Sequence, residues 1–415
     1  MHVLIIHQAF ASFDEPGGTR HYELARMLVK HGHRVTIIAS PVSYITGEAS
    51  LPPRPAEGLT RSRRADAHPN LRIRRARVYA AHHRSFVHRS LAFLSFMVSA
   101  FMLGLEEKDV DVVWGTSPPI SQGLSAWLLA RLKGAPLLFE VRDLWPKFAV
   151  AVGVLRSRLL IGLAEGLERF LYRRADAIIV NSPGFIQHVS ERGGRHVVLV
   201  PNGADPAMFD PDRDGQRFRA RWNVGGKFVA LYAGAHGMSN DLERLLQAAS
   251  LVAGEPIHIV LVGDGKEKPA LVLEARRLGL SNVTFAEPVA KREMPEVLAA
   301  AGACIAILRP LPEYRTTYPN KVFDYMAAGR PVVLAIEGVI REVVERAQCG
   351  VCVEPGNAAA LADALRELAR DPVRARRMGR NGRRYLEKHF SREAGAATLR
   401  NLLKDLVTRN RRPSS

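Results

Sequence analysis

Short apolar runs alternate with longer amphipathic segments along almost the whole chain. The runs have the length of strands buried on both faces, and the segments between them carry apolar residues at helical spacing. Strands that alternate with helices predict an α/β protein built on parallel sheets. The expected strands are residues 3–6, 34–39, 71–77, 111–114, 136–140, 177–180 and 196–200, then 228–233, 257–262, 283–286, 304–308 and 332–336.

The first amphipathic segment shows the pattern used to place the helices. Leu24, Ala25 and Leu28 form one apolar stripe, and a glycine between two histidines ends the segment. Residues 40–70 hold prolines and arginines with little periodicity and predict a long loop, and a disordered tail is expected from Thr408. The expected helices include 22–30, 86–105, 155–173, 242–253, 295–301, 358–370, 373–390 and 392–407.

The length of 415 residues exceeds one comfortable hydrophobic core and predicts two domains. The turn-rich segment Pro201-Asn202-Gly203-Ala204-Asp205 has few periodic neighbours and marks the expected boundary. We therefore expect two doubly wound Rossmann-like domains, residues 1–200 and 201–390, with a cleft between them. Residues 391–415 add a terminal helix that could pack back on the first domain.

The net charge of +18 is not evenly distributed along the chain. Ten arginines lie between residues 54 and 89, against Glu57 and Asp66 alone, and such a cluster suits a polyanion such as nucleic acid, an anionic membrane or a phosphorylated acceptor. Basic and aromatic residues are not interleaved, so we expect no nucleic-acid partner. The alternative is a generally arginine-rich composition, which residues 374–384 also show.

The apolar segment 86–105 follows this arginine cluster directly. It has nearly the length of a membrane helix, but His88, Arg89 and three serines interrupt it. A buried or interfacial helix is therefore expected, and peripheral contact with an anionic membrane is the hypothesis. No basic start or cleavage site precedes the first strand, and three cysteines cannot form a disulfide framework, so we expect a cytoplasmic protein at the inner face of the membrane.

Polar residues follow the strands of the first half, at the sheet edge where open α/β proteins bind ligands. The loop Gly17-Gly18-Thr19-Arg20 could receive a phosphate or a sugar at a helix start, or it could be a plain tight turn. Glu140 and Asp143 could act as a base or as orienting carboxylates, and Arg142 could hold phosphate or an acidic acceptor. A buried ion pair that secures the loop is the alternative for Glu140.

The second half repeats this arrangement. The loop with Gly234, His236 and Gly237 joins a strand to a helix start, a geometry that binds diphosphate through backbone N–H groups. A further helix is expected to begin at Asn320 as its N-cap and to end at Gly329. It sets Lys321 near its electropositive start and Asp324 one turn on, which suits a nucleotide diphosphate with its ribose. An ordinary solvated helix is the alternative.

Taken together, these segments resemble the GT-B-fold retaining glycosyltransferases of family 4. The resemblance covers nearly the whole chain and is nearest to the branch that adds N-acetylhexosamine or N-acetylfucosamine in O-antigen, capsule or exopolysaccharide assembly. The resemblance is carried by residues 17–22 (GGTRHY), 139–146 (FEVRDLWP), 201–205 (PNGAD), 262–265 (VGDG) and 319–331 (PNKVFDYMAAGRP).

The resemblance implies a reaction and a set of residues. A sugar would pass with retention from a nucleotide-diphosphate donor, expected to be UDP-linked, to a lipid-diphosphate-linked saccharide, with no metal or cofactor. Asp324 would bind the ribose, and Lys321 or Arg309 would neutralise the leaving diphosphate. Thr316 stands where the family has the first of two glutamates, and Arg142 where many relatives have a histidine. The implied donor set is Asn320, Lys321, Asp324, Thr316, Gly234, His236, Gly237, Arg309 and Val289; the catalytic set is Asp143, Arg142 and Glu140.

Two other functions remain open at this point. A UDP-sugar epimerase of GT-B fold would also need carboxylate and histidine groups in a cleft between two such domains. An arginine-rich nucleic-acid-binding protein would explain the charge, but the chain carries no recognisable binding module for it.

Overall fold

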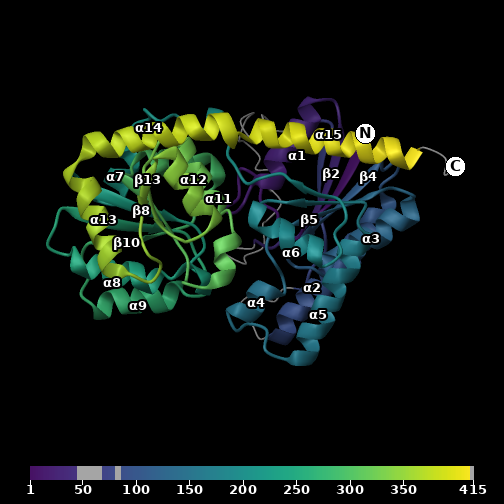
Figure 1. Ribbon diagram of the computed structural model, residues 1–415, viewed down its shortest axis with the longest axis horizontal. Helices are drawn as coiled ribbons and strands as arrows, with labels where there is room; N and C mark the ends of the chain where they lie inside the picture. Colours follow the sequence, from purple (N-terminus) through teal and green to yellow (C-terminus); the bar gives the residue numbers. More distant parts are fainter. Residues whose placement is uncertain (44–67, 80–85, 412–415) are drawn as a thin grey trace, which may run out of the picture. The chain divides into compact units, whose positions relative to one another are not determined.

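The computed structural model describes residues 1–43, 68–79 and 86–411 (Figure 1). The chain divides into two compact units, residues 1–200 with 396–415, and residues 201–395. Most of the loop expected at residues 40–70 lies outside the described residues, as do Arg54, Arg61, Arg63, Arg64 and Arg84 of the arginine cluster.

Unit 1 is built on a seven-stranded sheet in which every pairing is parallel, in the order β3-β2-β1-β4-β5-β6-β7. Its central strands are buried and mostly apolar, as expected for a parallel sheet covered by helices, whereas the edge strand β3 carries three arginines. The strands are β1 (His2–Ile6), β2 (Arg34–Ala39), β3 (Leu71–Arg75), β4 (Val112–Ser117), β5 (Leu137–Val141), β6 (Ala177–Val180) and β7 (Val197–Leu199).

Helices pack on this sheet through the apolar stripes that the sequence predicts. Phe96 of α2 and Leu129 of α3 join one core with Leu4 and Val113, and Leu171 of α5 joins a second core with β5 and β6. The helices are α1 (Arg20–Lys30), α2 (Phe86–Glu106), α3 (Gln122–Lys133), α4 (Lys147–Ala151), α5 (Arg158–Arg174) and α6 (Ile186–Glu191).

Unit 2 holds a six-stranded sheet in the order β10-β9-β8-β11-β12-β13, again parallel at every pairing. One of its faces is covered by α8, α9 and α13, and the other by α10, α11 and α12. The strands are β8 (Phe228–Ala233), β9 (Ile257–Val262), β10 (Val283–Ala286), β11 (Ala303–Ile307), β12 (Val332–Ala335) and β13 (Gly350–Cys352).

The helices of unit 2 and the terminal helix follow the sequence closely, with short additions. They are α7 (Gln216–Arg221), α8 (Leu242–Leu251), α9 (Lys268–Arg277), α10 (Met294–Ala299), α11 (Asn320–Ala327), α12 (Val339–Ala347), α13 (Ala358–Arg370), α14 (Pro372–His389) and α15 (Arg392–Arg411). Two parallel Rossmann-like α/β units confirm the predicted fold class. Helix α15 continues to Arg411, so the tail expected from Thr408 is helical over its first four residues.

Helix α12 is absent from the elements expected from the sequence, although Ile340, Val343, Val344 and Ala347 are buried at helical spacing. It follows β12 after a very short turn. Gly338 makes this turn with φ of 87°, and a Cβ there would lie 2.0 Å from the carbonyl oxygen of Arg315. Only Ile336, Glu337 and Gly338 therefore separate the strand from the helix in the sequence.

The arginines of β3 do not form an open anion-binding patch. Arg74 forms ion pairs with Glu106 at 2.5 Å and with Glu107 at 2.8 Å, and Arg75 with Glu15 at 2.6 Å. Arg72 remains largely exposed. At these two positions the predicted cluster is neutralised by the carboxylates of its own unit.

Candidate functional site

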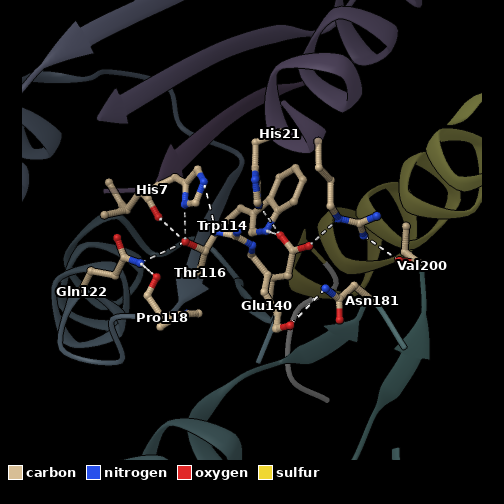
Figure 2. A network of polar contacts seen from close by, with 12 residues as sticks. His7, His21, Trp114, Thr116, Pro118, Gln122, Glu140, Asn181 and Val200 are labelled. Atoms are coloured by element: carbon tan, nitrogen blue, oxygen red, sulfur yellow. Dashed lines mark hydrogen bonds and ion pairs between the residues drawn. The ribbon is translucent and has the colours of Figure 1, made fainter. Parts of the chain in front are cut away.

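The strand order of unit 1 brings the ends of β1, β4 and β5 side by side. His7 follows β1, and Thr116 and Glu140 lie near the ends of β4 and β5 (Figure 2). Because neighbouring parallel strands end at one edge of a sheet, residues more than a hundred positions apart meet here. This edge is the part of unit 1 where a ligand is expected.

Glu140 lies at the centre of this network and has no exposed surface. Its carboxylate accepts hydrogen bonds from Arg20 Nε at 2.9 Å, His21 Nε2 at 2.5 Å and Trp114 Nε1 at 3.1 Å (Figure 2). Burial alone would raise the pKa of Glu140, but the charges of His21 and Arg20 and the bond from His21 hold this pKa below its usual range. Of the two interpretations of Glu140, the structure favours the buried ion pair over the predicted catalytic role.

The side chains of the loop predicted to bind phosphate are bonded to protein groups instead. Arg20 is buried, donating to Glu140 and to the carbonyl oxygen of Val200 at 2.6 Å, and Thr19 donates to Glu23 at 2.5 Å. These two side chains point into the protein and cannot receive a phosphate. Gly17 and Gly18 remain at the surface, so only the backbone of this loop is available to a ligand.

Arg142 and Asp143 follow β5 directly and lie at the surface of the same edge. Arg142 is half-buried, and its guanidinium nitrogen NH1 lies 3.3 Å from Nε2 of His7. Asp143 is exposed. Of the three predicted catalytic residues, these two are placed where they can reach a ligand.

In unit 2 the loops after β8 and β9 are packed so closely that glycines are required. His236 N donates to the carbonyl oxygen of Asp264 at 2.8 Å, and a Cβ at Gly265 would lie 2.5 Å from the carbonyl oxygen of His236. A Cβ at Gly234 would lie 2.6 Å from Nζ of Lys321. The glycines therefore allow the loops and the Lys321 side chain to approach one another.

Lys321 lies at the start of α11, with Nζ 3.9 Å from the centre of the Tyr232 ring. This distance is within the range of a cation–π interaction. Burial lowers the pKa of Lys321 to about 7. The amino group is thus held beside the Gly234 loop, and a pKa of about 7 means that its protonation changes near neutral pH.

Asp324 lies one turn further along α11. It accepts a hydrogen bond from Lys291 Nζ at 2.6 Å, and Lys291 is itself buried and lies 5.2 Å from the centre of the Phe209 ring. The structure therefore brings Lys321 and Asp324 together with a second lysine that the sequence analysis did not select. Among the described residues, no group of three or more His, Cys, Asp or Glu side chains is arranged as a metal site.

Two family models match the chain, and each covers one unit. Residues 17–203 match the glycosyl transferase 4-like domain, and residues 227–371 match the glycosyl transferases of group 1. The chain is a glycosyltransferase of the GT-B type. The predicted GT-B glycosyltransferase resemblance is confirmed at this level.

Known proteins resemble this glycosyltransferase over most of its length. The putative colanic acid biosynthesis glycosyl transferase WcaI of Escherichia coli K12 is 24% identical over 358 residues, which are 83% of this chain and 86% of WcaI. The structure of sucrose-phosphate synthase from Thermosynechococcus elongatus superimposes with a TM-score of 0.76 at 21% identity, covering 99% of this chain and 100% of that one. Anabaena HepE in complex with UDP and glucose gives 0.73 at 17% identity, covering 98% and 100%.

The remaining donor residues predicted for this glycosyltransferase have structural partners of their own. Asn320 is the first residue of α11 and not its cap, which is Pro319, and its Oδ1 accepts from Arg392 at 3.2 Å. Thr316 Oγ1 donates to the carbonyl oxygen of Glu313 at 2.7 Å. The others lie around the same loops: Gly237 precedes residues 238–240, Arg309 N donates to Ser239 O at 3.0 Å, and Val289 packs on the core of unit 2.

His236 is fully buried between the two loops, near the rings of Tyr232 and Phe285. Burial, followed by the charges of Lys268 and Lys321, lowers the pKa of His236 to about 4. The ring is therefore neutral at physiological pH, and we place His236 in the packing of the loops after β8 and β9.

The two connections between the units are hydrogen-bonded to the start of α11. In the first, Asn202 Nδ2 donates to the carbonyl oxygen of Tyr318 at 2.7 Å. In the second, buried Arg392 donates to Asn320 and to the carbonyl oxygen of Gly203. Neither Asn202 nor Arg392 was selected from the sequence, because nothing in their local pattern indicates these partners.

Proposed function

We propose that this glycosyltransferase moves an N-acetylhexosamine or N-acetylfucosamine, with retention, from its UDP-linked form to a lipid-diphosphate-linked saccharide during cell-surface polysaccharide assembly. The observation that carries the proposal is the pair Lys321 and Asp324 on α11, beside the glycine loops of unit 2. WcaI, named for colanic acid biosynthesis, and HepE, bound to UDP, support the substrate classes.

On the donor side, α11 supplies both kinds of contact that a nucleoside diphosphate needs. Its free N–H groups and the Lys321 ammonium would meet the diphosphate, and Asp324 would accept hydrogen bonds from the ribose hydroxyls. Lys321 would also stabilise the charge that develops on the leaving diphosphate. Because that charge is met by a side chain and backbone dipoles, we expect transfer to continue in excess EDTA.

On the acceptor side, Arg142 of unit 1 would hold the anionic part of the acceptor, and exposed Asp143 would lie beside it. The leaving diphosphate itself would take the acceptor proton as the new glycosidic bond forms on the same face of the sugar. A covalent sugar trapped on Asp143 would contradict this route.

Product analysis tests the proposed function. The protein is incubated with each of a panel of nucleotide sugars, with and without a polyprenyl-diphosphate-linked N-acetylglucosamine, and the products are identified by mass spectrometry. Growth of the lipid-linked product by one sugar, only when the acceptor is present, is the expected result. A new UDP-sugar formed without acceptor would identify an epimerase instead.

Replacing Asp324 with alanine is expected to abolish detectable UDP binding and to destabilise unit 2. Removal of the carboxylate leaves the buried ammonium of Lys291 without its partner, a cost of about 3 kcal/mol. The double variant Asp324→Ala/Lys291→Met should recover the stability but not the affinity, as measured by chemical denaturation and by calorimetric titration with UDP. Wild-type affinity in the double variant would contradict the ribose role.

We also propose a cytoplasmic location, peripheral to the inner face of the cell membrane. No helix within residues 1–43, 68–79 and 86–411 combines the length and apolar character of a membrane span. Helices α2, α3 and α5 nevertheless carry exposed apolar side chains and adjoin one another, since Ser125 donates to Met97 O at 2.8 Å and the rings of Trp127 and Phe170 lie 4.9 Å apart. The exposed residues include Leu91, Leu94, Val98 and Met102 of α2, Leu128 and Leu132 of α3, and Leu159 and Leu163 of α5.

Flotation with anionic vesicles is expected to carry the wild-type protein at low salt, because exposed apolar patches beside arginines favour an anionic lipid surface. The triple variant Leu94→Ser/Val98→Ser/Met102→Ser should remain in the unbound fraction. The exposed Leu273 of unit 2 provides a matched control, and Leu273→Ser should float like the wild type. Equal flotation of all three proteins would contradict the role of α2.

A further inference from the structure

We propose that His7 is a positioning residue, which holds Arg142 at the edge of the unit 1 sheet by accepting a hydrogen bond on Nε2 of a neutral ring. This rests on the proposed role of Arg142 in binding the anionic part of the acceptor. His7 is fully buried, and among the described residues its Nε2 is the acceptor that the Arg142 guanidinium contacts.

The hydrogen bonds around Thr116 fix which ring nitrogen of His7 carries the proton. The Thr116 hydroxyl has one proton, and its contact at 3.3 Å with the carbonyl oxygen of Ile6 requires it to donate there. Gln122 Nε2 donates to the same hydroxyl at 3.1 Å (Figure 2). The orientation of the Gln122 amide is set because its Oε1 accepts from Gln8 N at 2.8 Å. His7 Nδ1, 2.9 Å from Thr116 Oγ1, must therefore donate.

A neutral histidine with its proton on Nδ1 has a lone pair on Nε2. Arginine carries only donors and stays charged, so the contact at 3.3 Å is an Arg142 N–H that donates to His7. A second proton on His7 would turn both ring nitrogens into donors and place two positive groups in contact. The position of Arg142 thus depends on a His7 ring that stays neutral.

The surroundings of His7 keep it neutral. Burial, followed by the charges of His21 from α1 and Arg142 from the loop after β5, lowers the pKa of His7 well below its ordinary value. The His21 ring lies 3.9 Å from the His7 ring, and its Nε2 donates to Glu140, so this buried carboxylate is bonded to His21. Phe10 covers a further side of His7 at 6.4 Å between ring centres.

Two substitutions separate the two nitrogens of His7. In His7→Gln the amide oxygen reaches the place of Nε2 and can still accept from Arg142. In His7→Asn the amide reaches only the place of Nδ1, so the bond to Thr116 is kept and the bond to Arg142 is lost. Geranyl diphosphate serves as the probe for the acceptor's anionic group, and its dissociation constant is measured calorimetrically in the full chain, with UDP titrated separately.

We expect His7→Asn to weaken geranyl diphosphate binding about tenfold and His7→Gln to stay within about threefold of the wild type, since one positioning hydrogen bond is lost in the first alone. In an Arg142→Ala background His7→Asn should have no further effect, because the two residues act as one unit. UDP affinity should be unchanged in every variant.

Equal effects of the two His7 variants, or a tenfold effect of His7→Asn that persists without Arg142, would overturn the positioning role while the proposed transferase function stands. Failure of the wild type to bind geranyl diphosphate would overturn the acceptor role of Arg142 and this inference with it, leaving UDP binding in unit 2 as a separate result. Should both variants fail to fold, the ¹⁵N chemical shifts of the wild-type His7 ring show which nitrogen carries the proton. A proton on Nε2 would refute the proposal.

Discussion

Replacing Lys321 with alanine is expected to lower kcat/KM by about 10²–10³, the effect of removing one preorganised charge that stabilises a leaving oxyanion. The ammonium lies beside the Gly234 loop and over the Tyr232 ring, and this is the place from which it would contact the leaving diphosphate. The fold should survive, because removing this half-buried lysine leaves no carboxylate unpaired. Steady-state kinetics with the donor sugar identified by product analysis measure the effect.

Lys266 provides the matched control for this prediction. It is exposed and lies next to Gly265 in the neighbouring loop, so Lys266→Ala removes the same charge from a solvated position of the same unit. We expect Lys266→Ala to change kcat/KM less than twofold, as for an exposed charge screened by solvent. Comparable losses in both variants would indicate a general electrostatic effect in place of a contact by Lys321.

The pKa of about 7 gives Lys321 a pH signature of its own. A diphosphate favours the protonated ammonium, so below pH 7 the free protein already holds the binding form, and above it each binding event must take up a proton. UDP affinity should therefore fall between pH 7.5 and 9, by at most tenfold per pH unit. The slope should be absent in Lys321→Ala, and an affinity that rises with pH in the wild type would contradict the assignment.

The second large effect is expected at Glu140, where alanine should lower the free energy of unfolding of unit 1 by about 3–5 kcal/mol. The substitution leaves the buried groups of Arg20 and His21 without their carboxylate. Glu140→Gln keeps an acceptor oxygen in place and should cost less. Glu165, which pairs with Arg169 at the surface, is the control, and Glu165→Ala should cost less than about 1 kcal/mol.

Urea denaturation followed by tryptophan fluorescence can report on unit 1 alone. Three of the four tryptophans, Trp114, Trp127 and Trp145, belong to that unit, so a Trp222→Phe background removes the fourth. A Glu140→Ala transition at the wild-type urea concentration would show that the buried ion pair contributes nothing to stability. An unchanged transition for Glu165→Ala is needed for the comparison.

The fold was predictable because strands buried on both faces are apolar at almost every position. The run that forms β5 and the run that forms β9 are recognisable without any knowledge of their neighbours. Helix α12 shows the limit of this reasoning, since it follows β12 with only a glycine turn between two apolar segments. Where so few residues separate two elements, periodicity alone does not divide them.

The candidate site was predictable where the chemistry lies on one helix and not where it depends on strand order. Lys321 and Asp324 are three positions apart on α11, so helical geometry places them together. Lys291 contacts Asp324 across 33 residues of sequence. His7 contacts Arg142 across 135 residues, because β1 pairs with β4 and β4 pairs with β5. These contacts follow from the sheet topology, which the sequence pattern leaves open.

The hydrogen bonds of Asn202 and Arg392 to the start of α11 bear on how such enzymes can be recombined. Exchanging the donor-binding unit with that of a relative is a natural way to change the transferred sugar, and the obvious joints lie at residues 200/201 and 395/396. Since Asn202 contacts Tyr318 O and Arg392 contacts Asn320, both connecting segments are hydrogen-bonded to the start of α11, the helix proposed to bind the nucleotide. A functional chimera must therefore inherit residues 201–204 and 390–395 from the same parent as α11.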